Sequence, residues 1–407
     1  METPGKRREL WLASSLALLT LLAFYFSIKA TQQPFDYTAR IASALLEGRI
    51  GLDKPPPSWL NEMVPQDGRY YAVFPLGGVL SMLPFAVLQR THLIKDFPGR
   101  ALAALISALS AWFLFQLSVI GGVSLCKRVL LSLVLIFGTW TWCNLGFGGA
   151  WQIALGLAFL GEIGALYFLL VGLRPVAAGI FFALAIGNRT EIVLCLPIFL
   201  YLLLKQTAPE AKSLRVLAQK WRQHSRVCLY FLIFPLALAF FTALYNFARF
   251  HSIFDFGYGH IPNLLKEPWY SHGLFSLHAI PWNIHKMLFE GFRDVSTLPY
   301  ISFSPFGCSI FLASPFLFLI FREGGIHRAA AWIAIGLLTF ALWLHGNPGG
   351  WEFSYRYAMV LLPWMFLLLL GNGPPKITTT EASLFVVSIG INAIATYQFH
   401  WTTQIHP

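Results

Sequence analysis

The acidic residue best placed for chemistry in this sequence is Asp36, which stands four residues before Arg40. It opens a stretch, residues 35–47, in which apolar residues recur at helical spacing before Gly48 follows as a stop. This pattern predicts an amphipathic helix that begins at Asp36. Two interpretations of Asp36 fit the spacing: a carboxylate that caps the helix, and a general base that accepts a proton from an attacking hydroxyl.

Arginines in or beside apolar segments form the second set of candidates, because a guanidinium binds phosphate through two parallel hydrogen bonds. Arg69 follows an Asp-Gly pair, so a solvated turn residue is the alternative there. Arg249 and Arg356 stand at the ends of apolar spans, where snorkelling to the interface is the alternative. Arg189 is followed closely by Glu191 within an apolar stretch, and the two side chains can also simply neutralise each other.

Composition decides which elements position these residues. Of 407 residues, 57% are hydrophobic and 12% charged, and the mean hydropathy is +0.62. A soluble domain carries about 25% charged residues, so soluble, disordered and disulfide-scaffold classes are excluded. We predict an all-α polytopic integral membrane protein, one domain over residues 1–407, with about eleven or twelve transmembrane helices. The spans are expected near residues 10–28, 73–89, 101–120, 128–146, 150–173, 228–246, 301–320, 329–345, 356–371 and 383–399, with 175–204 forming two short helices or one broken helix.

Basic residues set the expected orientation. The start of the chain, residues 6–8, and the long connection 205–226 are basic and are therefore expected in the cytoplasm. Three loops then face outward, at 29–72, 247–300 and 346–356, and the first carries the amphipathic helix in the membrane interface. Ten of the eighteen acidic residues lie in these loops, which places the polar chemistry on the non-cytoplasmic face. The loops on both sides of the span at 101–120 are basic, so which of them faces the cytoplasm stays open. The sequence has no folded basic domain that would support nucleic-acid binding.

Five stretches of the chain resemble, in order, the GT-C superfamily of membrane glycosyltransferases, which take sugars from polyprenyl-phosphate carriers. The similarity spans about residues 35–365 and is most specific in the fourth stretch, which is similar to the YN-x-x-RF run of bacterial members. The stretches begin at Phe35-Asp36-Tyr37, Asp67-Gly68-Arg69-Tyr70-Tyr71, Ala185-Ile186-Gly187-Asn188-Arg189, Tyr245-Asn246-Phe247-Ala248-Arg249 and Gly349-Gly350-Trp351-Glu352.

The resemblance implies a role for each matched residue. Asp36 would be the general base that deprotonates the acceptor. The donor phosphate or sugar would be bound by residues of all five stretches: Arg40, Arg69, Tyr70, Tyr71, Arg189, Tyr245, Arg249, Tyr258, Glu352 and Arg356. Fixed cations of this kind stabilise the phosphate that leaves.

One departure from the superfamily concerns metal binding. Several relatives carry a glutamate and a lysine directly after the paired tyrosines, where this sequence has Ala72 and Val73. A divalent metal is therefore doubtful, no cofactor is implied with certainty, and the arginines must carry the phosphate. The expected partners are a polyprenyl-phosphate-linked sugar, an acceptor of unknown type and the lipid bilayer.

Two other functions fit the same pattern. A polymerase or ligase of lipid-linked oligosaccharides also uses outward-facing arginines. A transporter or flippase fits the hydropathy, although the sequence shows no internal repeat and its interruption at 187–191 occurs once.

Overall fold

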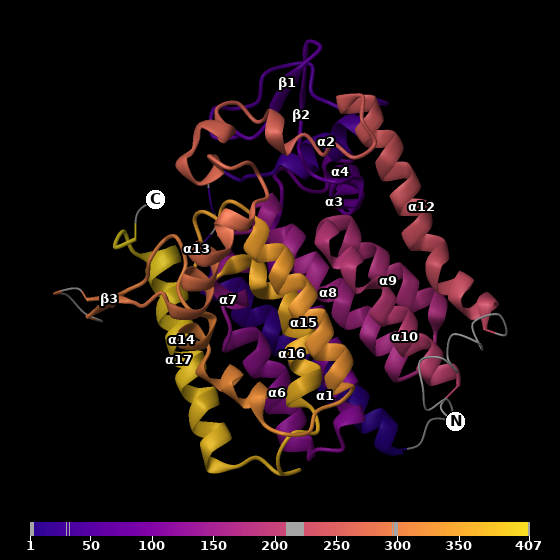
Figure 1. Cartoon of the computed structure of the whole chain (residues 1–407), viewed down its shortest axis with the longest axis vertical. Coiled ribbons are helices and arrows are strands. Elements are labelled where there is room, and N and C mark those ends of the chain that lie inside the picture. Colours follow the sequence, from indigo (N-terminus) through magenta and orange to yellow (C-terminus); the bar gives the residue numbers. More distant parts are fainter. Residues whose placement is uncertain are drawn as a thin grey trace.

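The computed structural model describes residues 4–29, 31, 33–208, 224–294, 296 and 300–405. Residues 209–223 of the basic connection predicted to be cytoplasmic lie outside this part. The described chain is built of helices with two short two-stranded sheets, which confirms the all-α prediction. Figure 1 shows a bundle of helices that carries a smaller layer of loops and short elements at one end.

Six helical segments in the described chain are long and apolar enough to cross a membrane. They are Arg7–Ser27 of α1 (Pro4–Ser27), α5 (Gly99–Leu117) with η1 (Ser118–Gly121), α8 (Ala150–Leu170), η2 (Thr190–Cys195) with α10 (Leu196–Thr207), α12 (Ser225–Phe250) and α17 (Thr379–Trp401). Shorter apolar helices complete the bundle: α3 (Leu76–Leu80) with α4 (Leu83–Arg90), α9 (Pro175–Asn188), α15 (Arg328–Leu344), and η9 (Arg356–Leu361) with α16 (Leu362–Leu369).

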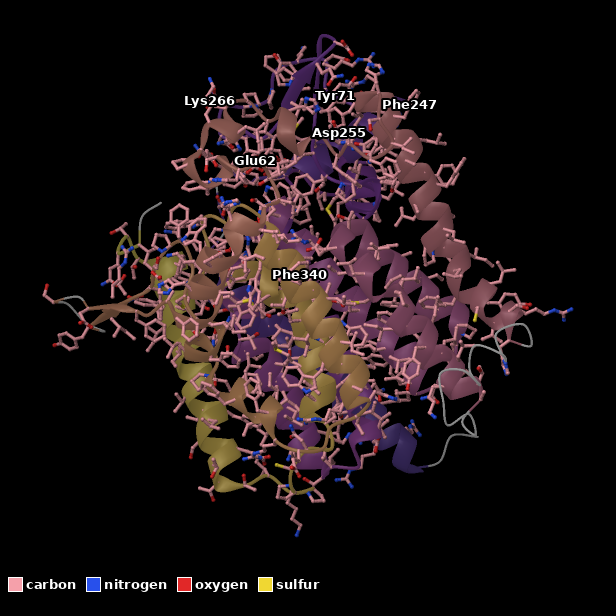
Figure 2. The ribbon with its side chains drawn as sticks, viewed as in Figure 1. Glu62, Tyr71, Phe247, Asp255, Lys266 and Phe340 are labelled. Carbon is pink, nitrogen blue, oxygen red and sulfur yellow. The ribbon has the colours of Figure 1, made fainter. Side chains whose placement is uncertain are left out.

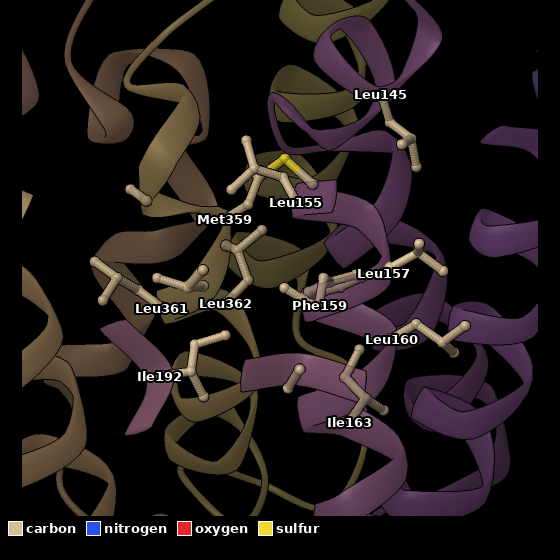
Figure 3. Packing of buried hydrophobic residues seen from close by; sticks show 14 of the residues in the cluster. Leu145, Leu155, Leu157, Phe159, Leu160, Ile163, Ile192, Met359, Leu361 and Leu362 are labelled. Atoms are coloured by element: carbon tan, nitrogen blue, oxygen red, sulfur yellow. The ribbon is translucent and has the colours of Figure 1, made fainter. Parts of the chain in front are cut away.

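Helix α8 forms the centre of the bundle and packs against α5 and α9. Small residues permit close approach there, because a Cβ at Gly161 would lie only 2.7 Å from the carbonyl oxygen of Phe181 on α9. On its other side α8 meets η9 and α16, and Figure 3 shows Phe159 of α8 beside Leu362 of α16. The residues of α16 are buried throughout, so this part of the bundle is surrounded by protein.

The layer at the end of the bundle, residues 33–74 and 251–270, is here termed the cap (Figure 1). It contains α2 (Tyr37–Leu45) and the hairpin of β1 (Val64–Gln66) and β2 (Arg69–Tyr71), and Figure 2 places Tyr71 and Asp255 in it. Asp67 and Gly68 have φ values of 50° and 74°, as the two-residue turn of a type I′ hairpin requires. The second cap segment holds three short elements, η3 (Tyr258–His260), η4 (Leu264–Lys266) and η5 (Pro268–Tyr270). The chain then continues along the bundle through η6 (Leu277–Ala279), α13 (Ile280–Ile284), η7 (His285–Phe289) and β3 (Arg293–Asp294).

Several expected spans are interrupted. The span at 73–89 divides into α3 and α4, because Pro84 starts a new helix at the second position of α4. The span at 128–146 divides into α6 (Leu125–Phe137) and α7 (Thr141–Gly146), and 301–320 contains only β4 (Ile301–Ser302), α14 (Ile310–Ala313) and η8 (Pro315–Phe321). Each of these three expected spans is therefore built of shorter pieces instead of one continuous helix. The break expected within 175–204 is confirmed, since Arg189 adopts an extended backbone between α9 and η2.

Candidate functional site

Asp36 takes the N-cap position of α2, as its place in the sequence predicts, but its side chain makes no capping hydrogen bond. Its Oδ1 instead accepts a hydrogen bond of 2.8 Å from Nε of Arg40, one turn further along the helix. Within the described chain no donor reaches Oδ2, so capping does not use this carboxylate. The helix is also shorter than the predicted 35–47, and Gly48, at φ 74°, follows its last turn.

A polar cavity of about 510 Å³ opens beside Asp36. Its charged lining residues are Asp36, Arg40, Glu47, Arg49, Lys95 and Asp96. Arg49 is held on the wall by Asp53, at 2.8 Å, and by Glu47. The indole of Trp59 donates a hydrogen bond of 3.2 Å to the carbonyl of Pro34 and also lines the cavity. Alternating charges and an aromatic side wall suit a hydroxyl-rich ligand, because such a ligand needs both donors and acceptors.

Arg189 and Tyr258 line a different cavity, of about 340 Å³, and Asp36 is not on its wall. Arg189 is paired with Glu191 at 2.6 Å, and its Cζ lies 4.6 Å from the centre of the Tyr357 ring. The hydroxyl of Tyr258 lies 3.2 Å from that of Tyr270. The geometry therefore fits mutual neutralisation of Arg189 and Glu191, with the pair exposed to an aromatic cavity.

Arg249 is fully buried and its donors are used inside the protein. Nη2 donates to Oδ1 of Asn246 at 2.7 Å, and Nη1 donates to the carbonyls of Ala72 and Phe74. Its Cζ lies 3.8 Å from the ring centre of Tyr245. Arg249 thus ties the end of α12 to the chain that leaves the cap hairpin. It neither snorkels nor faces a described cavity.

Glu352 and Arg356 form a buried pair in the third predicted loop, with 3.6 Å between Oε2 and Nε. The guanidinium also donates to the carbonyls of Gly349 and Trp351. Burial raises the pKa of the Glu352 carboxyl well above its ordinary value, although the nearby Arg356 opposes this. Oε1 of Glu352 has no hydrogen-bond partner in the described chain, so the pair retains an unused acceptor.

The hairpin residues have separate surroundings. Arg69 is exposed and pairs with Asp53 at 3.3 Å, as a solvated turn residue does. The amide of Tyr70 donates to the carbonyl of Leu52 at 2.9 Å, and buried Tyr71 packs edge-on against Phe250. These contacts hold the hairpin on the cap.

Glu62 is a candidate that the sequence motifs missed, since it stands in an irregular loop without helical or motif spacing. The indole of Trp151, at the start of α8, donates a hydrogen bond to its Oε2. Figure 2 shows Glu62 in the cap, on the side toward the bundle. Burial raises the pKa of the Glu62 carboxyl, and the Trp151 hydrogen bond and Arg356 only partly offset this.

Ala72 and Val73, which replace the acid and lysine of the resembled superfamily, are both buried. In the described part of the chain no three His, Cys, Asp or Glu side chains are grouped as metal ligands. The predicted residues thus fall into three groups: Asp36 with Arg40, Tyr245 with Arg249, and a third in which Arg189 and Arg356 meet over the ring of Tyr357, with Cζ distances of 4.6 and 5.3 Å from its centre.

Comparison with protein families, curated protein sequences and solved structures finds no match for this chain. The resemblance to the GT-C superfamily therefore stays a prediction that rests on the motifs alone.

Proposed function

We propose that this protein is a polytopic integral membrane glycosyltransferase of GT-C type that moves a sugar from a polyprenyl phosphate to a hydroxyl acceptor. Asp36 is the general base. One observation carries the proposal: the Asp36 carboxylate is held by Arg40 through one oxygen, while it lines a polar cavity and caps no helix. A carboxylate held in this way is positioned to accept a proton.

The reaction requires little of the protein beyond this geometry. Asp36 takes the proton of the acceptor hydroxyl as its oxygen attacks the anomeric carbon of the sugar. The bond from that carbon to the phosphate oxygen breaks, and its electron pair leaves with the polyprenyl phosphate. Arg40 fixes the carboxylate so that the base does not have to be reoriented during the reaction.

The six long apolar helices support a membrane location, which we place in the plasma or inner membrane with the N-terminus in the cytoplasm. Helix α12 presents many apolar side chains on its exterior, among them Phe240 at 60% and Leu236 at 55% exposure. In water such a surface is unfavourable, whereas it suits lipid chains. The cap then lies on the non-cytoplasmic side.

Transfer assays on purified protein test this proposal. Polyprenyl-phosphate sugars are supplied as donors to the wild type, to Asp36→Asn and to a matched control, Asp67→Asn, which alters an exposed acid of the same loop in the hairpin turn. We expect transfer by the wild type and the control only. Full transfer by correctly folded Asp36→Asn would overturn the role of the base.

The same assay separates the two other functions. Use of pyrophosphate-linked oligosaccharides in place of monophosphate donors would show a polymerase or ligase. Uptake of substrate into proteoliposomes without covalent transfer would show a transporter. Either result would contradict the proposed reaction.

A further inference from the structure

A third cavity, of about 540 Å³, lies at the end of α1 that meets the cap. Its polar and charged side chains are Tyr25, Lys29, Thr31, Asp96 and Arg100. None of these residues belongs to the five motif stretches. Two of them are cations, and Asp96 is the one acid on the wall.

Arg100 is positioned but has no acidic partner. Its Nη2 donates a hydrogen bond of 2.8 Å to the hydroxyl of Tyr25, and its Cζ lies 4.0 Å from the centre of that ring. No carboxylate forms an ion pair with it among the residues that the structure describes. The arginines that line the two cavities described above, Arg40, Arg49 and Arg189, are each paired with an acid. Arg100 therefore keeps an uncompensated charge for a ligand.

The backbone near Arg100 favours the same ligand charge. Leu102 carries the first amide of α5 that bonds within the helix, to the carbonyl of Pro98 at 2.9 Å. The amides of Arg100 and Ala101 precede it on the cavity wall and have no intrahelical acceptor. Free amides at a helix N-terminus attract anions. They add to the two cationic side chains here and are not the basis of the site.

This cavity adjoins the one beside Asp36. Both are lined by Pro34, Asp96 and Phe97, and Asp36 follows Pro34 by two residues. Tyr25 belongs to α1, whose apolar residues Leu22 and Phe26 are 41% and 72% exposed. A ligand with its charged group at Arg100 can therefore extend one part toward Asp36 and an apolar chain along the outside of α1.

We propose that Arg100 and Lys29 bind the phosphate of the polyprenyl-phosphate donor, with the lipid chain along α1 and the sugar toward Asp36. This subsite rests on the proposed function. The two cations stabilise the phosphate that receives the electron pair of the broken sugar–oxygen bond, while the acceptor proton goes to Asp36. Each of the five arginines that the motifs suggested already contacts an acid or a backbone carbonyl, whereas Arg100 pairs with no acid among the described residues.

Binding of decaprenyl phosphate by the detergent-solubilised full chain tests the subsite without requiring turnover. We expect Arg100→Gln to raise its Kd about tenfold, the usual value of a charge-assisted contact, and Lys29→Gln to raise it less. Arg100→Lys restores part of the affinity, because it keeps the charge and loses the fork. The matched control is Arg174→Gln, an exposed arginine before α9. Size-exclusion elution shows whether each variant is folded.

Competing ligands identify the source of the phosphate. Inorganic phosphate and phosphatidylglycerol are expected to displace the lipid poorly, and decaprenol without phosphate is expected to bind all variants alike. The subsite would be overturned if Arg100→Gln and the wild type bound decaprenyl phosphate with equal affinity. It would also be overturned if phosphatidylglycerol displaced decaprenyl phosphate as well as unlabelled decaprenyl phosphate does. Should Arg100-dependent binding occur while Asp36→Asn still transfers sugar, the proposed base fails and the phosphate subsite stands.

Discussion

The two ends of the bundle use charged residues in different ways. One end, where α1, α6 and α17 begin, is here termed the distal end. There Lys127 is buried and donates to Oε1 of Glu381 at 2.8 Å and to the carbonyl of Pro374 at 2.9 Å. Arg322 also donates to Oε1 of Glu381, while Oε2 accepts from the amide of Thr378 in a capping box. Both oxygens of this carboxylate are thus bound.

At the cap end the same residue types keep unused hydrogen-bonding capacity. Oε1 of buried Glu352 has no partner within the described residues, the ion pair of Asp36 uses Oδ1 alone, and Arg100 pairs with no acid there. Two of these three side chains line cavities. Asp36 and Arg100 therefore combine unused hydrogen-bonding capacity with an adjoining cavity, which is what a polar ligand needs. The charges of the distal end connect helices, and the cap end is where we place the chemistry.

The largest expected effect is on catalysis at the cap end. Asp36→Asn keeps the size of the side chain but removes the proton acceptor, so kcat is expected to fall by about a hundredfold to ten-thousandfold. Its thermal unfolding midpoint should stay near that of the wild type, because Asp36 makes no capping bond. A large loss of stability without a specific loss of kcat would place Asp36 with the structural charges instead.

At the distal end we expect the opposite outcome, a loss of stability without a change in kcat. Glu381→Ala leaves Lys127 buried without its anion and should lower the free energy of unfolding by about 3 kcal/mol. The kcat of the protein that remains folded should be unchanged. Glu9→Ala is the comparison variant, because Glu9 is 40% exposed and its partner Arg128 keeps hydrogen bonds to Ser118 and to the carbonyl of Phe115. It should cost about 1 kcal/mol or less. Equal losses in the two variants would remove the distinction between saturated and exposed pairs.

Arg249 tests whether a motif arginine at the cap end is structural. Arg249→Lys keeps the charge but cannot hold Asn246, Ala72 and Phe74 together, so it should lower stability by about 2 kcal/mol. The affinity for polyprenyl phosphate should not change. A tenfold loss of that affinity at unchanged stability would instead make Arg249 a phosphate ligand.

The sequence predicts the class of fold and several local features well. The helix after Asp36, the turn at Gly68 and the break at Arg189 follow from neighbouring residues alone, so local chemistry determines them. The expected long span at 301–320 failed because hydropathy does not register proline and glycine, which interrupt it at Pro305, Gly307 and Pro315.

The partners of the charged residues were beyond the sequence. Arg249 contacts Ala72, which stands 177 residues away, and no spacing rule reveals such a contact. For the same reason Arg100 resembles an ordinary helix-end residue in the sequence, and Glu62 resembles an ordinary loop residue. Their surroundings arise only when α1, α5 and α8 pack together with the first loop.

The smallest expected effect is a pH dependence of stability that distinguishes Glu62 from Glu381, whose two carboxylate oxygens both accept hydrogen bonds. Burial raises the pKa of folded Glu62, so between its ordinary pKa and the raised value the folded protein holds more protons than the unfolded chain. This contribution to stability is complete below the ordinary pKa and is lost as pH rises. Lowering the pH from 7 to 5 should therefore raise the unfolding midpoint of the wild type relative to Glu62→Gln. Parallel midpoints for the two proteins across this range would show that Glu62 stays ionised beside Trp151 and Arg356.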